Sequence, residues 1–203
     1  MSRIDETLKV ERRHFLQTLL VGGVAVAVGA GVLTPRLFAT ESTENLPADI
    51  PGNVRLEIFG ADGRDLGARQ VARLVLTDKQ WRERLSADAY HQMRHEGTER
   101  PFTGKYWDFY AKGIFRCAAC ATALYDADTK FHSGTGWPSF YQPIAKSNII
   151  ETTDHKFGMR RTAISCAGCN SHLGHVFNDG PRPTGLRYCM NSPALSFAAH
   201  SVS

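Results

Sequence analysis

The chain has 203 residues, of which 42% are hydrophobic and 22% are charged, a composition typical of globular rather than disordered proteins. Its length fits one domain with additional segments. The formal net charge is +4, and residues 1–39 contribute +2 of it through five basic and three acidic side chains. The remaining charge is too small for the clustered basic face that binds nucleic acid, so we expect no nucleic-acid partner.

Residues 12–39 have the three-part pattern of an export signal. Two adjacent arginines, Arg12 and Arg13, are followed by residues 19–33, which carry no polar side chain, and by a cleavage-like ending at Ala39. The paired arginines followed by Phe and Leu resemble a twin-arginine signal, which bacteria use as an export address. By that resemblance, the route carries proteins that are already folded.

We therefore assign residues 1–40 to a twin-arginine-type signal peptide, residues 41–52 to a polar linker with two prolines, and residues 53–200 to the folded domain. This assignment predicts a location in the periplasm or cell envelope of a bacterium. The alternative is an uncleaved membrane anchor. The apolar segment contains four glycines, which make it less hydrophobic than a membrane span of about 20 predominantly apolar residues. We therefore expect membrane attachment only if the signal is retained.

The start of the domain predicts a β-hairpin followed by two helices. Apolar and polar residues alternate over 53–58, an Asp-Gly turn follows, and a second apolar run covers 71–76. Thr77 and Ser86 are N-cap candidates, so we expect one helix between them and a second helix that ends near Arg94.

Short strand-like runs dominate the chain after Gly113, and each is bounded by Gly, Pro, Asn or Asp. They cover residues 114–116, 123–125, 149–153, 157–164, 175–177, 186–189 and 194–197. Many short strands with turn residues between them predict an antiparallel β core. The expected fold is therefore mainly β.

Four of the five cysteines form two Cys-x-x-Cys pairs, Cys117 with Cys120 and Cys166 with Cys169, separated by 45 residues. Two such pairs complete the tetrahedral sulfur shell that zinc takes in structural sites. Because the protein fills all four positions, we predict one structural Zn²⁺ ion rather than a catalytic one. The alternative is two disulfides, which an oxidising compartment favours. Folding before export would allow zinc to be loaded in the reducing cytoplasm.

Cys189 is the fifth cysteine and has no partner at metal-ligand spacing. An unassigned thiol is either a small packing residue or a nucleophile. Asn191 follows it closely, His172 and His175 come soon after the second cysteine pair, and Trp137 is fixed between a glycine and a proline. These residue types together are what a thiol-dependent catalytic site needs.

Several stretches of the chain together resemble the methionine-R-sulfoxide reductase family of the B type. They are residues 94–108, both cysteine pairs, and residues 134–140, 172–177 and 185–192. The resemblance extends over about residues 85–197. It implies a zinc-containing fold of two antiparallel β-sheets with peripheral N-terminal helices, makes 53–200 a reductase domain, and implies reduction of the R epimer of methionine sulfoxide.

The resemblance also implies a role for each site residue. It assigns catalysis to the nucleophile Cys189 and to His172, His175 and Asn191, which line the polar side of the pocket. It assigns substrate binding to Trp137, whose indole receives the substrate methyl group, and to Phe177 and Arg187. A sulfoxide is attacked only when its oxygen is protonated or hydrogen-bonded, and His172 or His175 can supply that donor. Attack by the thiolate leaves a cysteine sulfenic acid.

One position departs from the family pattern. Many family members carry a resolving cysteine where this chain has Thr135, and a threonine hydroxyl cannot form a disulfide. We therefore expect an external thiol, either a thioredoxin-like protein or a small thiol, to reduce Cys189. Recruitment of a zinc cysteine is the alternative. We expect a monomer that acts on protein-bound or peptide methionine sulfoxide.

Two other classes of function compete with this hypothesis. One is a zinc-stabilised peptide-binding module, which would leave the polar residues near Cys189 without a purpose. The other is a general thiol-disulfide oxidoreductase that uses one cysteine pair, which would leave the second pair with an incomplete metal shell.

Overall fold

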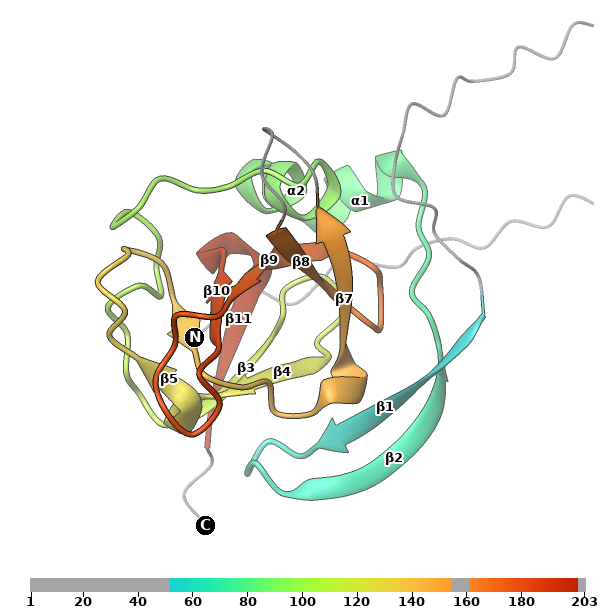
Figure 1. The fold of residues 1–203 in the computed structure, drawn as a ribbon. Helices are drawn as coiled ribbons and strands as arrows, with labels where there is room; N and C mark the ends of the chain where they lie inside the picture. The colour runs from blue at the N-terminus through green and yellow to red at the C-terminus, as the bar shows by residue number, and fades with distance from the viewer. Residues whose placement is uncertain (1–51, 155–160, 201–203) are drawn as a thin grey trace, which may run out of the picture. The chain divides into compact units, whose positions relative to one another are not determined.

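The computed structural model describes residues 52–154 and 161–200, and the fold is given for these residues (Figure 1). The predicted signal peptide, 1–40, and all of the predicted linker except Gly52 lie outside the described residues. Within the described ranges, no helix is long and apolar enough to cross a membrane.

A two-stranded antiparallel sheet opens the domain, formed by β1 (Asn53–Phe59) and β2 (Asp65–Ala72). The predicted hairpin is thus confirmed, but the position predicted for its second strand, 71–76, is wrong. The run after β2 is apolar because Leu74 and Leu76 pack against the core after the chain has left the sheet. Backbone pairing with β1 sets the limits of β2, whose own residues are mostly exposed.

The two predicted helices are confirmed as α1 (Asp78–Arg84) and α2 (Ala87–Arg94). The Thr77 side chain accepts a hydrogen bond from the backbone of Gln80, and the Gln80 side chain accepts one from the backbone of Thr77, which forms a capping box. The Ser86 hydroxyl caps α2 by accepting from the N–H of Ala89. Each helix buries one side against the sheets through Trp81 and Met93, both fully buried.

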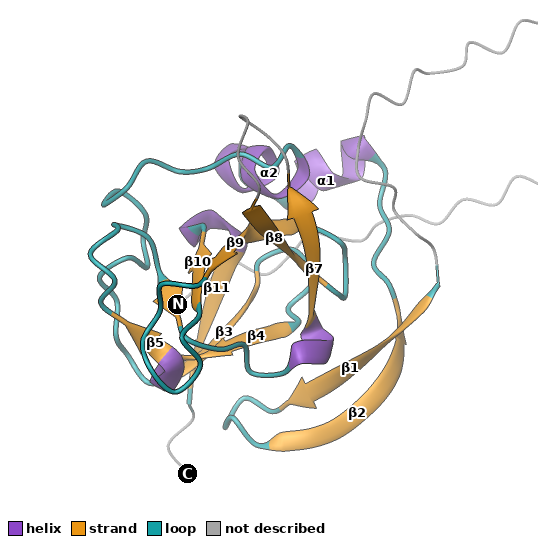
Figure 2. Ribbon diagram, in the orientation of Figure 1, coloured by secondary structure: helices purple, strands orange, loops and turns teal. Residues whose placement is uncertain are grey.

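Two further antiparallel sheets form the body of the domain, so the predicted mainly β class is confirmed (Figure 2). The six-stranded sheet has the order β5-β6-β10-β9-β8-β7, and the three-stranded sheet has the order β11-β3-β4. Their strands are β3 (Gly113–Cys117), β4 (Ala123–Asp126), β5 (Lys130–Phe131), β6 (Ser139–Phe140), β7 (Ile149–Asp154), β8 (Arg161–Cys166), β9 (His172–Phe177), β10 (Arg187–Met190) and β11 (Leu195–Ala199). Short 3₁₀ turns at Ala127–Thr129, Lys146–Asn148 and Ser192–Ala194 connect them.

Beyond β2 and shifts of one or two residues at strand ends, the strand predictions differ from the structure in three places. The sequence did not reveal β5 and β6, because each has only two residues and they flank a segment rich in Gly and Ser. β9 begins at His172, three residues before the predicted 175–177, since pairing with β8 extends it. The run predicted over 157–164 overlaps β8, and its residues 157–160 lie outside the described residues.

Aromatic side chains join the two larger sheets. Phe115 of β3 lies 5.1 Å from Phe140 of β6, centroid to centroid, and Tyr125 of β4 stacks on Phe140 at 4.4 Å. Tyr188 of β10, which is paired with Phe140, contacts Tyr125 at 5.9 Å. All four rings are buried, and truncating one such ring costs about 3–5 kcal/mol. Phe140 and Tyr188 therefore fix which face of the six-stranded sheet is turned towards the core.

Candidate active site and metal centre

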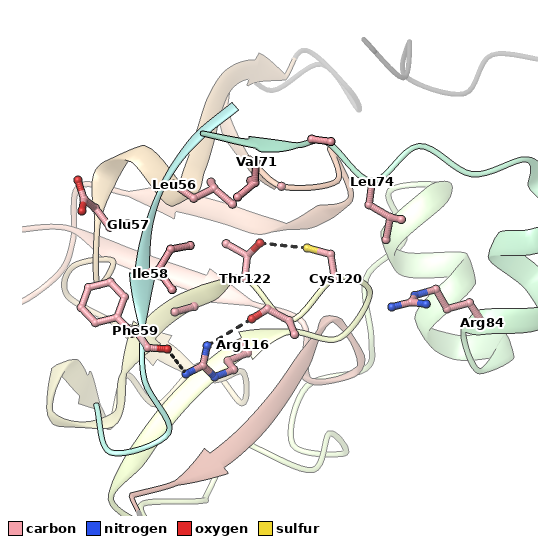
Figure 3. Close-up of a pocket in the computed structure, with 14 residues that line it drawn as sticks. Leu56, Glu57, Ile58, Phe59, Val71, Leu74, Arg84, Arg116, Cys120 and Thr122 are labelled. Atoms are coloured by element: carbon pink, nitrogen blue, oxygen red, sulfur yellow. Dashed lines mark hydrogen bonds between the residues drawn. The ribbon is translucent and has the colours of Figure 1, made fainter. Parts of the chain in front are cut away.

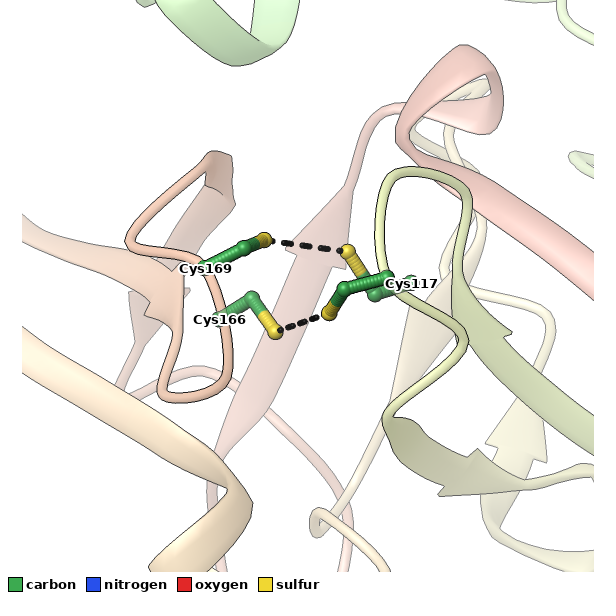
Figure 4. A group of neighbouring side chains, drawn as sticks. Cys117, Cys166 and Cys169 are labelled. Carbon is green, nitrogen blue, oxygen red and sulfur yellow. Dashed lines mark hydrogen bonds between the residues drawn. The ribbon is translucent and has the colours of Figure 1, made fainter. Parts of the chain in front are cut away.

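The four paired cysteines form one cluster at the ends of β3 and β8. Their sulfur atoms all lie within 4.8 Å of one another, and the thiols of the two pairs point towards each other (Figure 4). Cys117 Sγ lies 3.6 Å from Cys169 Sγ, and Cys120 Sγ lies 3.5 Å from Cys166 Sγ. Four thiolates at about 2.3 Å from a tetrahedral zinc are about 3.8 Å apart, so these residues fit one such ion. All five cysteines are free, which contradicts the disulfide alternative.

The two cysteine pairs adopt the same backbone turn. In each, the N–H of the first cysteine donates to the carbonyl of the residue five positions on, Thr122 or Ser171, at 2.8 and 2.9 Å. The hydroxyls of Thr122 and Ser171 lie 3.1 and 3.3 Å from Sγ of Cys120 and Cys169, respectively. The cluster is therefore built from two equivalent turns, one from each of the two larger sheets.

A cavity of about 410 Å³ lies between the β1–β2 hairpin and the first cysteine pair (Figure 3). Its wall includes Leu56 and Val71 of the hairpin and Cys120, which is partly exposed while the other three clustered cysteines are buried. The Arg116 guanidinium closes one end by donating to the carbonyl of Phe59 at 2.9 Å, and burial lowers the pKa of Arg116. None of the predicted catalytic or substrate-binding residues lines this cavity.

Cys189 lies on the opposite side of its sheet from the core. On β10 it is paired with Ser139 of β6 and with His175 of β9. Residues directly opposed in an antiparallel pair share one face, and successive residues alternate between faces. Because Phe140 and Tyr188 point into the core, Cys189 and its two opposed neighbours point away from it.

The Cys189 thiol is half-buried among polar groups. Burial raises the pKa of Cys189, whereas the Arg187 charge and hydrogen bonds from Thr135 and Ser139 act to lower it, and burial is the larger effect. The hydroxyls form a chain, since Ser139 donates to Ser133 at 2.8 Å and Ser133 lies 2.8 Å from the Thr135 hydroxyl. Burial therefore favours the protonated form of the thiol.

Arg187, Phe177 and Asp179 form one unit beside Cys189. The Arg187 guanidinium donates two hydrogen bonds to the Asp179 carboxylate, at 2.9 and 2.8 Å, and its carbon lies 4.4 Å above the centre of the Phe177 ring. The ion pair raises the pKa of Arg187 and lowers the pKa of Asp179. This fixed geometry holds a positive charge near the thiol.

His175 is part of a hydrogen-bonded group of largely buried polar side chains on the same face. Its Nε2 donates to the Asp154 carboxylate at 2.9 Å, and Arg161 donates to the same oxygen at 2.7 Å. Burial lowers the pKa of His175, and the Asp154 hydrogen bond opposes this shift. The ring of His172, which is buried, lies edge to face with His175 at 5.2 Å between centroids.

A break in the strand register brings both histidines to this face. A shift in pairing between Ile164 and Ser165 of β8 places Ser165 opposite His172 and Ile164 opposite Gly174. Gly174 has no side chain because an added Cβ would collide with the carbonyl oxygen of Cys189. The shifted pairing of β9 with β8 therefore places both histidines on one face. Gly174 allows β10 to approach β9 closely.

Trp137 is held by the loop that follows α2. Its indole N–H donates to the carbonyl of Glu99 at 3.1 Å, and the N–H of Phe102 donates to the carbonyl of Gly136 at 2.8 Å. Gly136 has φ +84°, which favours glycine. Trp137 is half-buried and is held by the loop of residues 99–102. It lies two positions after Thr135, which interacts with Cys189.

Asn191 joins the same loop to the sheet. Its side-chain oxygen accepts from the N–H of Glu99 at 3.2 Å, and its side-chain nitrogen donates to the carbonyls of Gly97 and Leu173, both at 3.3 Å. The carboxylate of Glu99 accepts from the N–H of Ser192, and burial raises the pKa of Glu99. The amide of Asn191 is thus engaged with backbone groups.

The sequence is similar to those of known proteins. The model of the SelR domain family matches residues 85–199. The chain also shares 58% identity over 121 residues with "Peptide methionine sulfoxide reductase MsrB" of Thiobacillus denitrificans, covering 60% of this chain and 92% of that protein. The chain belongs to the MsrB family, which carries the SelR domain. Membership makes it an oxidoreductase.

Two other MsrB relatives support the same conclusion. "Peptide methionine sulfoxide reductase MsrB" of Agrobacterium fabrum is 53% identical over 121 residues, covering 60% of this chain and 90% of that protein. "Peptide methionine sulfoxide reductase B1, chloroplastic" of Oryza sativa is 53% identical over 120 residues, covering 59% of this chain and 56% of that protein.

The structure of this MsrB chain brings most of the predicted site residues together on one sheet face. Cys189, His172, His175, Phe177 and Arg187 lie there directly. Trp137 and Asn191 are joined to each other through Glu99. Sequence reasoning missed the partners of these residues, which are Ser133, Ser139, Asp154, Arg161, Asp179 and Glu99. Their only local signal is a hydroxyl-rich or turn-like context, which is common in loops.

Proposed function

We propose that the protein reduces the R epimer of methionine sulfoxide in proteins to methionine, with Cys189 as the nucleophile. The observation that carries the proposal is the placement of this thiol. Cys189 is separate from the four-cysteine cluster, is hydrogen-bonded by Thr135 and Ser139, lies beside Arg187, and is directly opposite His175. The names of the relatives, peptide methionine sulfoxide reductase, support the same substrate.

The first step transfers one oxygen atom. The thiol proton of Cys189 passes to Nδ1 of His175, and the proton then moves to the sulfoxide oxygen as the sulfur of Cys189 attacks. The S–O bond of the substrate breaks, an S–O bond to Cys189 forms, and methionine leaves as the thioether. The substrate sulfur gains two electrons and Cys189 loses two, which leaves a sulfenic acid.

His175 suits this proton transfer. Because Nε2 donates to Asp154, the neutral ring presents Nδ1 as an acceptor. Burial keeps the pKa of His175 low, so the ring is neutral at neutral pH. Cβ atoms of directly opposed residues lie about 4.5–5.5 Å apart, which places this ring beside the thiol. His172, stacked edge to face on His175, is a second donor for the sulfoxide oxygen.

The remaining predicted residues bind and orient the substrate in this proposal. Trp137 receives the substrate methyl group, and Phe177 with Arg187 bounds the opposite side of the pocket. The charge of Arg187 stabilises the thiolate as it forms. Asn191 acts through the loop that holds Trp137, because its amide is committed to backbone groups.

Zinc is the metal proposed for the cysteine cluster. One Zn²⁺ ion would be held by Cys117, Cys120, Cys166 and Cys169. When bound by four thiolates, the ion has a structural role. All four ligands come from the protein, so the cluster has no role in proton or oxygen transfer. Its effect is to tie β3 of one sheet to β8 of the other.

An external thiol completes the proposed cycle. One thiol condenses with the sulfenic acid, forms a mixed disulfide and releases water; a second thiol displaces Cys189 and leaves as a disulfide. Thr135 occupies the position next to Cys189 from which a second cysteine would react. We therefore assign regeneration to a thioredoxin-like protein or a small thiol, acting on a monomeric enzyme.

The site of action proposed for the enzyme is the bacterial envelope. The twin-arginine-like sequence within residues 1–40 supports export after folding and metal loading. Cell fractionation tests this part separately. Replacing Arg12 and Arg13 by lysine should leave the protein in the cytoplasm, and an unchanged distribution would refute the export route.

Assay of the full chain with a methionine-R-sulfoxide peptide and dithiothreitol tests the reductase function. The wild-type protein should reduce the R epimer and leave the S epimer unchanged. Cys189→Ser should abolish turnover while the metal content and circular dichroism spectrum stay the same. Turnover by Cys189→Ser would show that another group performs the reaction. Disulfide reductase activity without sulfoxide reduction would favour a general thiol-disulfide oxidoreductase.

A further inference from the structure

Phe102 combines an exposed ring with an unusual backbone conformation. Its relative exposure is 54%, and its φ is +64°. The left-handed region costs a residue with a Cβ about 1–2 kcal/mol and is uncommon for aromatic residues. An apolar ring held at the surface by an unfavourable backbone conformation points to a role in binding.

Contacts with the Trp137 loop hold Phe102 in this position. Its N–H donates to the carbonyl of Gly136 at 2.8 Å, and a Cβ added to Gly136 would lie 2.6 Å from that nitrogen and 2.8 Å from the Phe102 ring. Thr135, which is hydrogen-bonded to Cys189, precedes Gly136, and Trp137 follows it. Phe102 is therefore separated from the reacting thiol by a single loop.

Phe102 is one of four aromatic side chains that form two ring pairs linked by Lys130. Trp107 lies edge to face with Phe102 at 5.3 Å, and the carbonyl of Trp107 accepts from Lys130 Nζ at 3.1 Å. Lys130 Nζ lies 3.8 Å from the centre of the Tyr110 ring, and the Tyr110 and His132 rings are tilted against each other with 4.1 Å between centroids. We call Phe102, Trp107, Tyr110 and His132 the aromatic ridge.

The distribution of exposed apolar side chains singles out this ridge. Within the described part of the chain, four large hydrophobic side chains are exposed: Leu66, Val75, Phe102 and Tyr110. The two aromatic ones both belong to the ridge, beside the site. Exposed aromatic rings next to a pocket are typical of binding surfaces, because they offer a large apolar area with little side-chain entropy to lose.

We propose that the aromatic ridge binds the polypeptide that flanks the methionine sulfoxide, with an apolar side chain of the substrate packed on Phe102. The inference rests on the proposed function, because it takes the Trp137 pocket as the place of the sulfoxide. Polypeptide is the occupant since the ridge continues directly from that pocket. An extended chain advances about 3.3 Å per residue, so the residues that flank the sulfoxide extend beyond its pocket, whereas a free amino acid has no such residues.

Steady-state kinetics of the full-length enzyme with three substrates tests the proposal. They are N-acetyl-methionine-R-sulfoxide and two hexapeptides with a central methionine-R-sulfoxide, one flanked by leucine and the other by serine. Phe102→Asn removes the ring and keeps a residue that tolerates positive φ. It should lower kcat/KM for the leucine peptide at least about fivefold and leave the value for the acetylated amino acid within about twofold.

A matched control and a second variant protect the test from folding artefacts. Leu66→Thr removes an equally exposed apolar side chain from β2, away from the ridge, and should change none of the three values. Tyr110→Ser should reduce the preference for the leucine peptide in the same direction as Phe102→Asn. Equal losses of Phe102→Asn on all three substrates, or no loss on any, would overturn the proposal.

Calorimetry tests peptide binding to the aromatic ridge independently of the proposed reductase activity. The leucine peptide is titrated into Cys189→Ser and into the double variant that also carries Phe102→Asn, so that no turnover occurs. Weaker binding to the double variant supports the ridge even if the wild-type enzyme fails to reduce the sulfoxide. Equal binding by both proteins contradicts the ridge even if sulfoxide reduction is observed.

Discussion

The Asp154 carboxylate lies 2.9 Å from Nε2 of His175, although β8 separates their strands. Asp154 also accepts from Arg161, and the side chains of Asp154 and His175 are 10% and 12% exposed. A buried carboxylate that binds one imidazole nitrogen fixes the tautomer and leaves the other nitrogen as a base. In this chain, the His175 that Asp154 orients lies on the face that carries Cys189.

Asp154→Asn should therefore change both the rate and its pH dependence. The Asp154 hydrogen bond raises the pKa of His175 against the effect of burial, while the Arg161 charge lowers it. Without the carboxylate charge, this pKa falls further. Because the neutral ring acts as the base, the acidic limb of the pH profile should move to lower pH, and kcat should fall by about 10–100-fold.

Single-turnover rates between pH 5 and 9 measure this effect. The groups that influence His175 are Asp154, Arg161, Glu96 and the adjacent His172, so the profile is interpreted with all four present. Glu151→Gln is the matched control, since it neutralises a carboxylate on the same strand that contacts Tyr188 instead. An acidic limb that stays in place or moves to higher pH in Asp154→Asn would contradict the role of His175 as a base.

The sequence predicts those parts of the fold that depend on local chemistry. Thr77 and Ser86 cap their helices because an N-cap side chain bonds to a backbone group two or three residues away. The two cysteine pairs are also local, since each turn is closed within six residues. These features need no knowledge of strand pairing.

The partners of the site residues depend on pairing between distant strands. Asp154 and His175 meet because both strands pair with β8, where Asp154 is opposite Arg161 and His175 is opposite Ala163. Nothing in the local sequence around Asp154 marks that contact. The same holds for Asn191, because its side-chain amide is hydrogen-bonded to a loop more than ninety positions away. Site residue types are therefore readable from the sequence, whereas the groups that orient them are set by long-range register.

Arg187→Gln should make the Cys189 thiol less reactive. The Arg187 charge lowers the pKa of Cys189, while burial raises it. Loss of the cation therefore raises this pKa further and decreases the thiolate fraction at neutral pH. Alkylation of Cys189 by iodoacetamide, followed by peptide mass spectrometry, should be several-fold slower at pH 7, with its midpoint shifted to higher pH. Unchanged alkylation in the variant would show that the guanidinium does not stabilise the thiolate.

Thr135→Cys should add an intramolecular resolving step. The Thr135 hydroxyl interacts with the Cys189 thiol, and a cysteine at position 135 would form a disulfide with Cys189 if its Cβ came to about 3.5–4.5 Å. After one turnover, the variant should lose two hydrogens and contain a disulfide with Cys189. The wild-type protein should instead contain a sulfenic acid, trapped by dimedone. A disulfide between Cys189 and a clustered cysteine in the wild-type protein would contradict regeneration by an external thiol.

Loss of one clustered cysteine should separate stability from chemistry. Cys166 is fully buried at the end of β8, and its cluster links that strand to β3 of the other sheet. Cys166→Ser should abolish zinc binding, measured by elemental analysis, and lower the thermal midpoint by more than about 10 °C, because metal affinity contributes several kcal/mol to folding. Cys189→Ser is the matched replacement outside the cluster and should change neither quantity. If chelation of the wild-type protein leaves its thermal midpoint unchanged, the cluster does not hold the two sheets together through a metal.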